Sequence, residues 1–360
     1  MDFTSGYAML IDGKLDSGSA SFDVLNPANE QVIGAAPGAA RADLDRAVAA
    51  ARAAFPGWAA TPIADRRAAL NAMGQAIMAN ADGLKRLLTA EQGKPHADAE
   101  GEAMGAGYWL MGAASLDLPV TVNEDSAERY SETRHIPLGV VGAIAPWNFP
   151  LILAMFKVGP ALLAGNTMVL KPSPFTPLAT LKLGEIVKDL LPPGVLNIVT
   201  GGDALGPWMT EHPGFDKISF TGSTATGRRV MQSASATLKR VTLELGGNDA
   251  AIVMPDADVE KVAEELFWAA FRNNGQICIA TKRMYVHADI YEPLRDAIVA
   301  YARTVKVGDG SEQGTQIGPI NNAPQYHRVL ELIQDAKDKG YTFLMGGEKS
   351  EAPGYFIPIT

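Results

Sequence analysis

Between residues 140 and 245, short apolar runs alternate with longer segments whose apolar positions recur at helical spacing. The apolar runs predict strands over 140–145, 167–170, 195–200, 217–220 and 241–245. The segments between them predict helices over 177–190, 204–212 and 224–234. Strands separated by helices of this length form parallel sheets. We therefore expect a doubly wound α/β fold that binds its ligand at the carboxyl ends of the strands.

The segments on either side have different patterns. Ala-rich sequence with helical spacing predicts helices over 41–55 and 63–95, and alternating polar and apolar residues predict a hairpin or arm over 117–137. A further α/β unit after Gly247 is predicted to contain strands over 250–254, 282–287, 305–307 and 342–345 and helices over 259–272, 290–304 and 324–339. We expect one domain from 1–116 and 138–246, a hairpin over 117–137, and a second domain over 247–360.

The composition is that of a globular protein. The 360 residues are 47% hydrophobic and 20% charged, with a net charge of −9, which argues against nucleic acid or an anionic membrane as the main partner. No basic start followed by an apolar run is visible, so we expect a cytoplasmic protein. The most apolar stretch, 140–170, contains prolines, asparagines and a lysine. It therefore predicts two buried strands around a short helix rather than a membrane span.

Cys278 is the only cysteine, so it cannot form an internal disulfide. It is either a small buried apolar residue or a nucleophile, and taken alone the inert core residue is the better interpretation. The five histidines share no metal-ligand spacing and none is near Cys278 in the sequence. The sequence therefore indicates no metal site and does not suggest a Cys–His hydrolase.

Four polar or glycine-containing segments follow predicted strands, at 146–150, 171–174, 220–227 and 243–248. Gly222 and Ser223 open a helix, where backbone N–H groups can bind a phosphate, although a plain strand-to-helix turn would look the same. Glu244 ends an apolar strand, so it is either a base in apolar surroundings or a carboxylate that backbone donors satisfy. Asn148 is either an amide donor or a turn cap.

Together these segments resemble the aldehyde dehydrogenase superfamily. The resemblance rests on Pro-Trp-Asn-Phe-Pro at 146–150, Lys-Pro-Ser at 171–173, Phe-Thr-Gly-Ser at 220–223, Leu-Glu-Leu-Gly-Gly at 243–247 and Gly-Gln-Ile-Cys at 275–278, in the family's order. It implies a Rossmann-type cofactor domain, an α/β catalytic domain and a small β oligomerisation arm at 117–137. It also implies oxidation of a small aldehyde with NAD or NADP in a homodimer or homotetramer.

The resemblance implies roles for single residues. Cys278 resembles the nucleophile that forms a thiohemiacetal and then a thioester, Asn148 an oxyanion-hole donor together with the Cys278 backbone N–H, and Glu244 the base that activates water. Because Glu244 is present, the hydrolytic branch is preferred over CoA-acylating relatives. The implied cofactor contacts are Ile144, Ala145, Pro146, Trp147, Lys171, Ser173, Pro174, Gly201, Gly202, Asp203, Phe220, Thr221, Gly222, Ser223, Thr226, Leu245 and Gly246. The implied substrate contacts are Phe149, Phe156, Arg272, Ile277 and Ile279.

Three departures from the family pattern matter. Pro174 stands where many NAD-preferring members have a glutamate that repels a 2′-phosphate, so we expect use of both cofactors with NAD favoured. Arg272 stands where succinate-semialdehyde dehydrogenases bind the substrate carboxylate, but Phe156 replaces their second arginine. The sequence ends at Thr360, inside the catalytic domain of family members, and we expect a chain ending there to be poorly soluble and nearly inactive.

Four interpretations remain open. The leading one is a non-acylating aldehyde dehydrogenase, and a succinate-semialdehyde-type enzyme is its variant. A catalytically silent cofactor-binding fragment is an alternative of another class, against which the presence of Cys278, Glu244 and Asn148 argues. A thiol esterase is the last, because a cysteine with an oxyanion hole can hydrolyse activated esters without hydride transfer.

Overall fold

The computed structural model describes all 360 residues, which divide into two compact units. The first unit comprises Met1–Phe22, Ala35–Leu84 and Gly101–Glu244, and the second comprises Asp23–Gly34, Lys85–Glu100 and Leu245–Thr360. Four of the five boundaries fall inside β3 (Ala20–Leu25), β4 (Val32–Gly38), α3 (Ala81–Gln92) and α4 (His96–Ala114), and the fifth follows Glu244. β3 and β4 pair as a two-stranded sheet.

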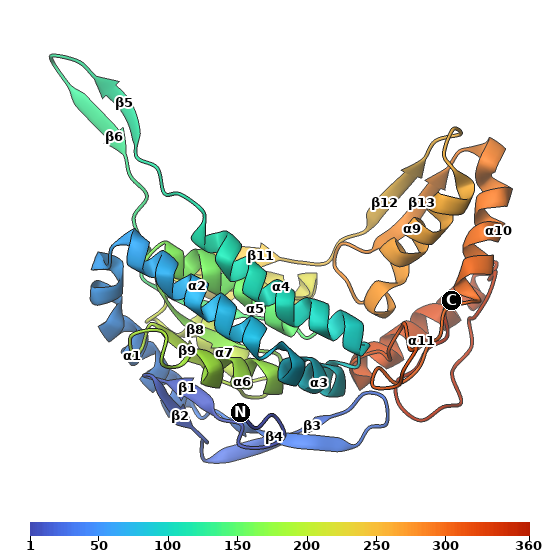
Figure 1. Ribbon diagram of the computed structural model, residues 1–360, viewed down its shortest axis with the longest axis horizontal. Coiled ribbons are helices and arrows are strands. Elements are labelled where there is room, and N and C mark those ends of the chain that lie inside the picture. The colour runs from blue at the N-terminus through green and yellow to red at the C-terminus, as the bar shows by residue number, and fades with distance from the viewer. The chain divides into compact units, whose positions relative to one another are not determined.

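A seven-stranded sheet forms the centre of the first unit, in the order β11-β10-β7-β8-β9-β1-β2 (Figure 1). Its strands are β1 (Met9–Ile11), β2 (Lys14–Asp16), β7 (Val140–Ile144), β8 (Thr167–Lys171), β9 (Leu196–Ile198), β10 (Lys217–Thr221) and β11 (Arg240–Glu244). The strands from β11 to β9 are parallel, and β1 joins β9 antiparallel. Every residue of β7 and β8 is buried, as expected for strands covered on both faces.

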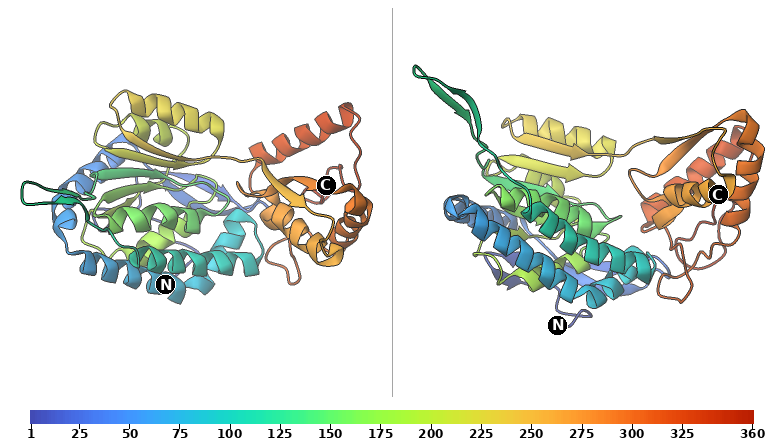
Figure 2. Two further views of the ribbon diagram at one scale, coloured as in Figure 1. Left: turned by 90° about the horizontal axis from the view of Figure 1, so that it is seen from above. Right: turned by 45° about the horizontal axis from the view of Figure 1, so that its top comes forward.

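Helices cover both faces of this sheet (Figure 2). One group consists of α2 (Ile63–Ala79), α5 (Pro150–Leu163) and α6 (Leu178–Val187), which pack on one another. The other consists of α1 (Arg41–Ala60), α7 (Leu205–Glu211) and α8 (Thr224–Ser235). The buried positions of α1 include Leu44, Ala47, Val48 and Ala51, which recur at the spacing of one helix face.

The strand order reverses at β7. The chain leaves β7 for β8 and β9 on one side and then returns to β10 and β11 on the other side. In a doubly wound sheet, the loops that follow the two central strands diverge at such a point and leave a crevice for a ligand. The doubly wound parallel sheet predicted from the sequence is therefore confirmed, and the reversal lies between the carboxyl ends of β7 and β10.

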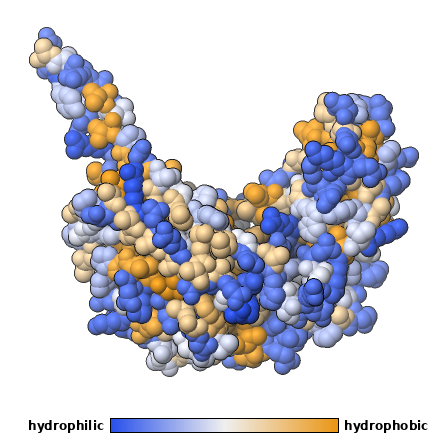
Figure 3. All heavy atoms as spheres, in the orientation of Figure 1, coloured by the Kyte–Doolittle hydropathy of each residue, from blue (hydrophilic) through white to orange (hydrophobic).

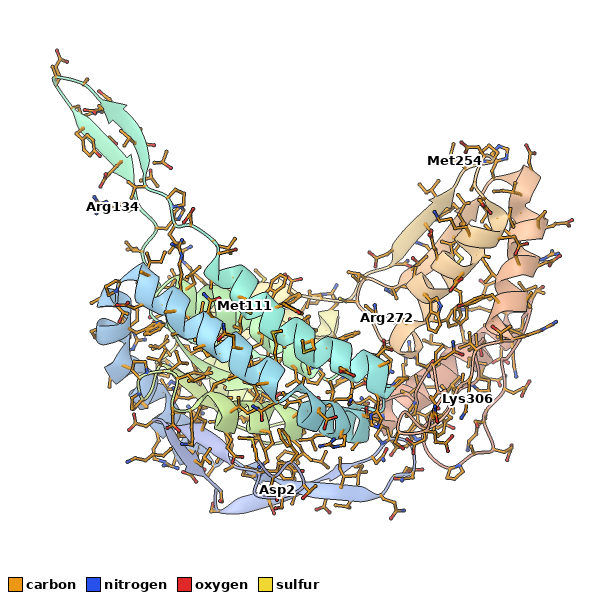
Figure 4. The ribbon with its side chains drawn as sticks, viewed as in Figure 1. Asp2, Met111, Arg134, Met254, Arg272 and Lys306 are labelled. Carbon is orange, nitrogen blue, oxygen red and sulfur yellow. The ribbon has the colours of Figure 1, made fainter.

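A hairpin of β5 (Thr121–Asp125) and β6 (Tyr130–Thr133) projects from the rest of the first unit (Figure 1). Its strands pair antiparallel, with an irregularity between Val122 and Glu124. Arg134, which follows β6, pairs with Glu132 beside it (Figure 4). The hairpin predicted over 117–137 is present, with its paired part shorter than the predicted range.

The second unit contains a two-stranded parallel sheet of β12 (Asp249–Val253) and β13 (Thr281–Val286). Its helices are α9 (Val259–Phe271), α10 (Tyr291–Ala302) and α11 (Ala323–Asp338), with short 3₁₀ turns η1 (Arg272–Gly275) and η2 (Ala288–Ile290). Apolar side chains of β12, α9 and α10 form one core cluster around Leu294. A second cluster around Phe267 includes Ile317 and Ile359.

Several predictions of local structure were wrong or incomplete. The strand predicted over 342–345 is absent, because this segment lies between left-handed glycines at Gly340 and Gly346 and has no neighbouring strand to pair with. The strand predicted over 305–307 is reduced to a single bridge between Val307 and Ile317. The helix predicted over 63–95 is divided into α2 and α3. The sequence analysis did not predict α4 or the four N-terminal strands.

The apolar stretch over 140–170 forms β7, α5 and β8, as predicted. Among the helices of the structure, none has both the length and the apolar character that crossing a membrane requires.

Candidate active site

The carboxyl ends of four neighbouring strands bring predicted cofactor residues into one row of the first unit. Ile144 at the end of β7 pairs with Lys171 of β8 on one side and with Phe220 of β10 on the other. Thr221, the last residue of β10, pairs with Glu244, the last residue of β11. The strand register therefore places side chains from four separate sequence segments along one edge of the sheet.

The turn between β10 and α8 combines a capped helix start with small residues. Ser223 is the N-cap of α8, and its side-chain oxygen accepts a hydrogen bond from the Thr226 N–H at 3.2 Å. A Cβ atom on Gly222 would lie 2.6 Å from the Phe220 ring, so the turn requires glycine there. The Gly222 N–H donates to the Glu244 carbonyl at 3.0 Å. A helix start with small, exposed residues suits a phosphate group.

Lys171 is a buried cation at the end of β8. Its ammonium group donates to the Pro172 carbonyl at 3.2 Å. Burial lowers the pKa of Lys171 to about 8, and the negative charge of Asp203 partly opposes this shift. Asp203 and Gly202 are exposed, Gly201 is buried, and a Cβ on Gly202 would meet no protein atom within 4 Å. Of the neighbouring candidates, Ser173 is buried and accepts a hydrogen bond from the Phe175 N–H at 3.2 Å, whereas Pro174 is half-buried.

Lys157 is a second buried lysine near this edge, and the sequence analysis missed it. Its ammonium group donates to the Ser219 hydroxyl at 3.2 Å and to the Thr221 hydroxyl at 2.8 Å. Burial lowers its pKa to about 8; the negative charge of Glu244 opposes the shift and the positive charge of Lys217 adds to it. A single lysine in an otherwise apolar helix was the available signal in the sequence.

The segment with Asn148 joins β7 to α5. Ala145 is buried, and Pro146, Trp147, Asn148 and Phe149 are half-buried. The buried carboxylate of Glu102 accepts hydrogen bonds from the N–H groups of Leu151 at 2.9 Å and Ile152 at 3.4 Å. Because these N–H groups belong to the first turn of α5, Glu102 acts as its cap and fixes the helix that follows Asn148.

Phe156 of α5, a predicted substrate contact, stacks on Trp109 of α4 with ring centroids 3.8 Å apart. Both rings are about 40% exposed, so they form an aromatic surface on the first unit. The sequence analysis did not identify Trp109, because nothing in the sequence connects it to α5.

Glu244 is exposed at the end of β11. The sequence left open whether this carboxylate lies in apolar surroundings or is satisfied by backbone donors, and the exposed position does not provide apolar surroundings. The physical reason is that β11 is the edge strand of the sheet and contains no buried residue.

Cys278 of the second unit lies on an irregular turn between α9 and β13. Three successive residues before it, Asn273, Asn274 and Gly275, have left-handed backbone conformations with φ between 51° and 70°. Asparagine and glycine are the residues that adopt this conformation most readily. The turn therefore follows from the local sequence Asn-Asn-Gly.

Gln276 connects this turn to a distant segment of the chain. Its amide nitrogen donates to the carbonyls of Asn273 at 2.8 Å and Pro319 at 3.2 Å, and its amide oxygen accepts from the Asn321 N–H at 2.9 Å. The Asn321 side chain in turn donates to the Glu91 carbonyl at 2.9 Å. Side-chain amides thus hold the backbone before Cys278 in addition to the backbone hydrogen bonds of η1.

Lys282 holds the turn on the other side of the cysteine. Its ammonium group donates to the carbonyls of Cys278 at 2.8 Å, Ala280 at 2.7 Å and Ile277 at 3.3 Å. The Cys278 thiol is half-buried, as is Ile277, whereas Ile279 is exposed. The turn precedes the amino end of β13, and Met254 follows the opposite end of β12 (Figure 4).

Arg272, the predicted carboxylate contact, forms an ion pair with Asp98 at 3.3 Å on the surface of the second unit (Figure 4). A cavity of about 690 Å³ in the second unit is lined by residues between Ala302 and Ile359 and by Ala28, and it includes none of the predicted site residues. The candidate site therefore rests on the chemistry of the sheet's carboxyl edge and of the Cys278 turn, and not on this cavity.

Comparison with known proteins identifies the family. A model of the aldehyde dehydrogenase family matches residues 15–360. The chain belongs to the aldehyde dehydrogenase family. The predicted fold and the predicted class, an NAD(P)-dependent aldehyde dehydrogenase, are thereby confirmed.

Individual proteins of similar sequence or structure support this family assignment. A probable aldehyde dehydrogenase of Pseudomonas sp. is 46% identical over 360 residues, which are 100% of this chain and 74% of that protein. An E. coli NADP-dependent enzyme superposes with a TM-score of 0.94 at 36% identity, over 98% of this chain and 75% of that one. PnpE of Pseudomonas sp. WBC-3, in complex with nicotinamide adenine dinucleotide, superposes with a TM-score of 0.92 at 36% identity. The match covers 98% of this chain and 74% of that one.

Proposed function

We propose that this chain oxidises an aldehyde to the carboxylic acid with Cys278 as the nucleophile. The observation that carries the proposal is the Cys278 turn, where a half-buried thiol lies on a backbone fixed by Gln276 and Lys282. A nucleophile held in one geometry lowers the entropic cost of attack. Family membership supports the aldehyde as substrate.

In the proposed reaction, the Cys278 sulfur attacks the aldehyde carbon and forms a thiohemiacetal. The Asn148 amide and the Cys278 N–H donate hydrogen bonds to the resulting oxyanion. A bound NAD(P)⁺ would supply the hydride acceptor for this carbon. Glu244 then takes a proton from the water that attacks the Cys278 thioester, and the acid is released with the cysteine restored. One aldehyde, one NAD(P)⁺ and one water give one acid, one NAD(P)H and one proton.

The first unit is proposed to hold the cofactor. Lys171 would contact the adenosine ribose, and the Gly222–Ser223 turn would contact the pyrophosphate. The buried ammonium, the capped helix start and the missing Cβ atoms suit these groups. Because Pro174 supplies no carboxylate, we propose that both cofactors are used and that NAD is favoured. Equal or better kcat/KM with NADP would contradict that preference.

The experiment is an assay of NADH formation at 340 nm with a panel of aldehydes. Cys278→Ser is expected to lower the rate at least about 1,000-fold, since the nucleophile is lost. Glu244→Gln is expected to retain a single turnover of NADH formation and to lose steady-state turnover by about 100-fold or more. Retention of full activity by Cys278→Ser would disprove the proposal. Ester hydrolysis without NADH formation by the unchanged chain would favour a thiol esterase.

We further propose that the hairpin takes part in a homodimer or homotetramer. Its strands present apolar side chains to solvent, with Val122 51% and Tyr130 58% exposed. Figure 3 shows apolar side chains among polar ones along this projection. Exposed apolar groups of this kind are typical of contact surfaces. A mass of one chain by light scattering would contradict this proposal.

A further inference from the structure

The two polar groups of the peptide unit between Ile277 and Cys278 differ in their hydrogen bonding. The Ile277 carbonyl accepts two hydrogen bonds, from the Ala280 N–H at 3.2 Å and from the Lys282 ammonium at 3.3 Å. The Cys278 N–H belongs to the same peptide unit, and it donates no hydrogen bond to a backbone carbonyl of the second unit. A trans peptide is planar, so its C=O and N–H point in opposite directions. Fixing the carbonyl therefore fixes the direction of the Cys278 N–H.

Lys282 also acts on the next peptide unit. Its ammonium donates to the Cys278 carbonyl at 2.8 Å and to the Ala280 carbonyl at 2.7 Å, and the Asp249 carboxylate lies 3.5 Å from it. Three carbonyls around one ammonium use all of its protons. A cation bound to a carbonyl withdraws electron density from the peptide and makes its N–H a stronger donor.

We propose that Lys282 is a positioning residue for the oxyanion hole. It orients and polarises the Ile277–Cys278 peptide. It thereby strengthens the hydrogen bond that the Cys278 N–H donates to the negatively charged substrate oxygen. The inference rests on the proposed function, because it takes Cys278 as the nucleophile. Lys282 itself touches neither substrate nor cofactor in this role.

The proposal predicts different effects of Lys282 on two reactions of the Cys278 thiol. Acylation by p-nitrophenyl acetate forms a bond from Sγ to the carbonyl carbon and passes through a tetrahedral oxyanion. The C–O bond then breaks, p-nitrophenolate leaves with the bonding electrons, and the thiol proton goes to solvent. Alkylation by iodoacetamide displaces iodide at carbon and develops no oxyanion. Only the first reaction uses the hydrogen bond of the Cys278 N–H.

The test measures both rates on the full 360-residue chain without cofactor. Lys282→Met is expected to slow acylation by about tenfold, which is less than the roughly 100-fold to 1,000-fold loss on removing an oxyanion donor because the Cys278 N–H remains, and to change alkylation by less than about threefold. Lys282→Arg, which keeps a charged donor, is expected to recover most of the acylation rate. Lys261→Met, on an exposed position of α9, is the matched control and is expected to change neither rate.

Three outcomes would overturn the proposal. The first is acylation of Lys282→Met at the unchanged rate, and the second is an equal fall of both rates, which would mean that Lys282 acts on the thiol or on folding. If Lys282→Met does not fold, as judged by its circular dichroism melt, Asp249→Asn replaces it and should slow acylation alone by about twofold to threefold. The third is a chain that p-nitrophenyl acetate does not acylate at Cys278, which would overturn the proposed function as well.

Discussion

The carboxyl edge of the seven-stranded sheet and the Cys278 turn place their side chains by different means. At the sheet edge, Ile144, Lys171 and Phe220 are neighbours because their strands are in register. At the turn, three left-handed residues precede Cys278, and side chains of Gln276 and Lys282 bind the backbone. Strand register is maintained by many hydrogen bonds, whereas the turn depends on a few polar side chains.

This difference predicts different responses to mutation. Loss of one side chain at the sheet edge leaves the ladder of backbone hydrogen bonds in place, so the effect stays local. Loss of one amide at the turn leaves backbone groups without partners and removes the constraint on the nucleophile. The following predictions test the contrast, beginning with the largest expected effect.

Replacing Gln276 with alanine should damage the turn most. The Pro319 carbonyl and the Asn321 N–H lose their partner, while the Asn273 carbonyl keeps the Gln276 backbone N–H at 3.2 Å, and each group left unsatisfied costs about 1–3 kcal/mol. We expect the free energy of unfolding to fall by about 2–4 kcal/mol and kcat to fall by about 100-fold, because a small displacement of a nucleophile is costly. Chemical denaturation and steady-state kinetics measure the two effects.

Gln334→Ala is the matched control. Gln334 lies on the exposed face of α11 and donates to Asp338 at 2.7 Å, so its loss should change the free energy of unfolding by less than about 0.5 kcal/mol. Equal effects of the two substitutions would show that the turn is no more sensitive than an ordinary surface.

The sheet edge could be predicted from the sequence, and most of the turn could not. β7 and β8 contain short apolar runs, and β9, β10 and β11 have apolar residues at alternate positions, so the pattern predicts both the strands and the residues at their ends. The contacts of Glu102 and Lys157 join segments whose proximity arises only on folding, whereas Lys282 binds carbonyls two to five residues before it. Lys157 is marked in the sequence only as the one lysine of an apolar helix, and no local pattern distinguishes Lys282 or Glu102 from other charged side chains. The Asn-Asn-Gly sequence did signal an irregular backbone, but not the direction in which it places Cys278.

Lys171 offers a test at the sheet edge with a smaller expected effect. Its pKa of about 8 means that it is charged below pH 8 and increasingly neutral above it. A neutral amine can still form a hydrogen bond with the ribose hydroxyls of NAD, but it loses its attraction to the 2′-phosphate of NADP. Between pH 7 and pH 9, we expect the KM for NADP to rise several-fold more than the KM for NAD.

The control for this prediction is Lys171→Arg. Arginine stays charged across this range, so the ratio of the two KM values should no longer depend on pH. A constant ratio in the unchanged chain would mean that the Lys171 charge does not act on the 2′-phosphate. The sheet edge would then contribute only backbone and hydroxyl contacts to cofactor binding.

The smallest effect is expected at Arg272, which lies next to the turn but outside its hydrogen-bond network. Its ion pair with Asp98 is exposed, with the arginine side chain 58% accessible, and such pairs contribute about 0–1 kcal/mol. If Arg272 serves only this pair, Arg272→Ala should leave the KM for succinate semialdehyde, relative to that for an uncharged aldehyde, within about twofold. A selective rise of tenfold or more would instead show that Arg272 leaves Asp98 to bind a substrate carboxylate, since a charge-assisted hydrogen bond is worth about that much. Asp98→Asn distinguishes the two roles: it should leave the ratio unchanged if the pair is only structural, and should lower the KM for the semialdehyde if Asp98 competes for the arginine.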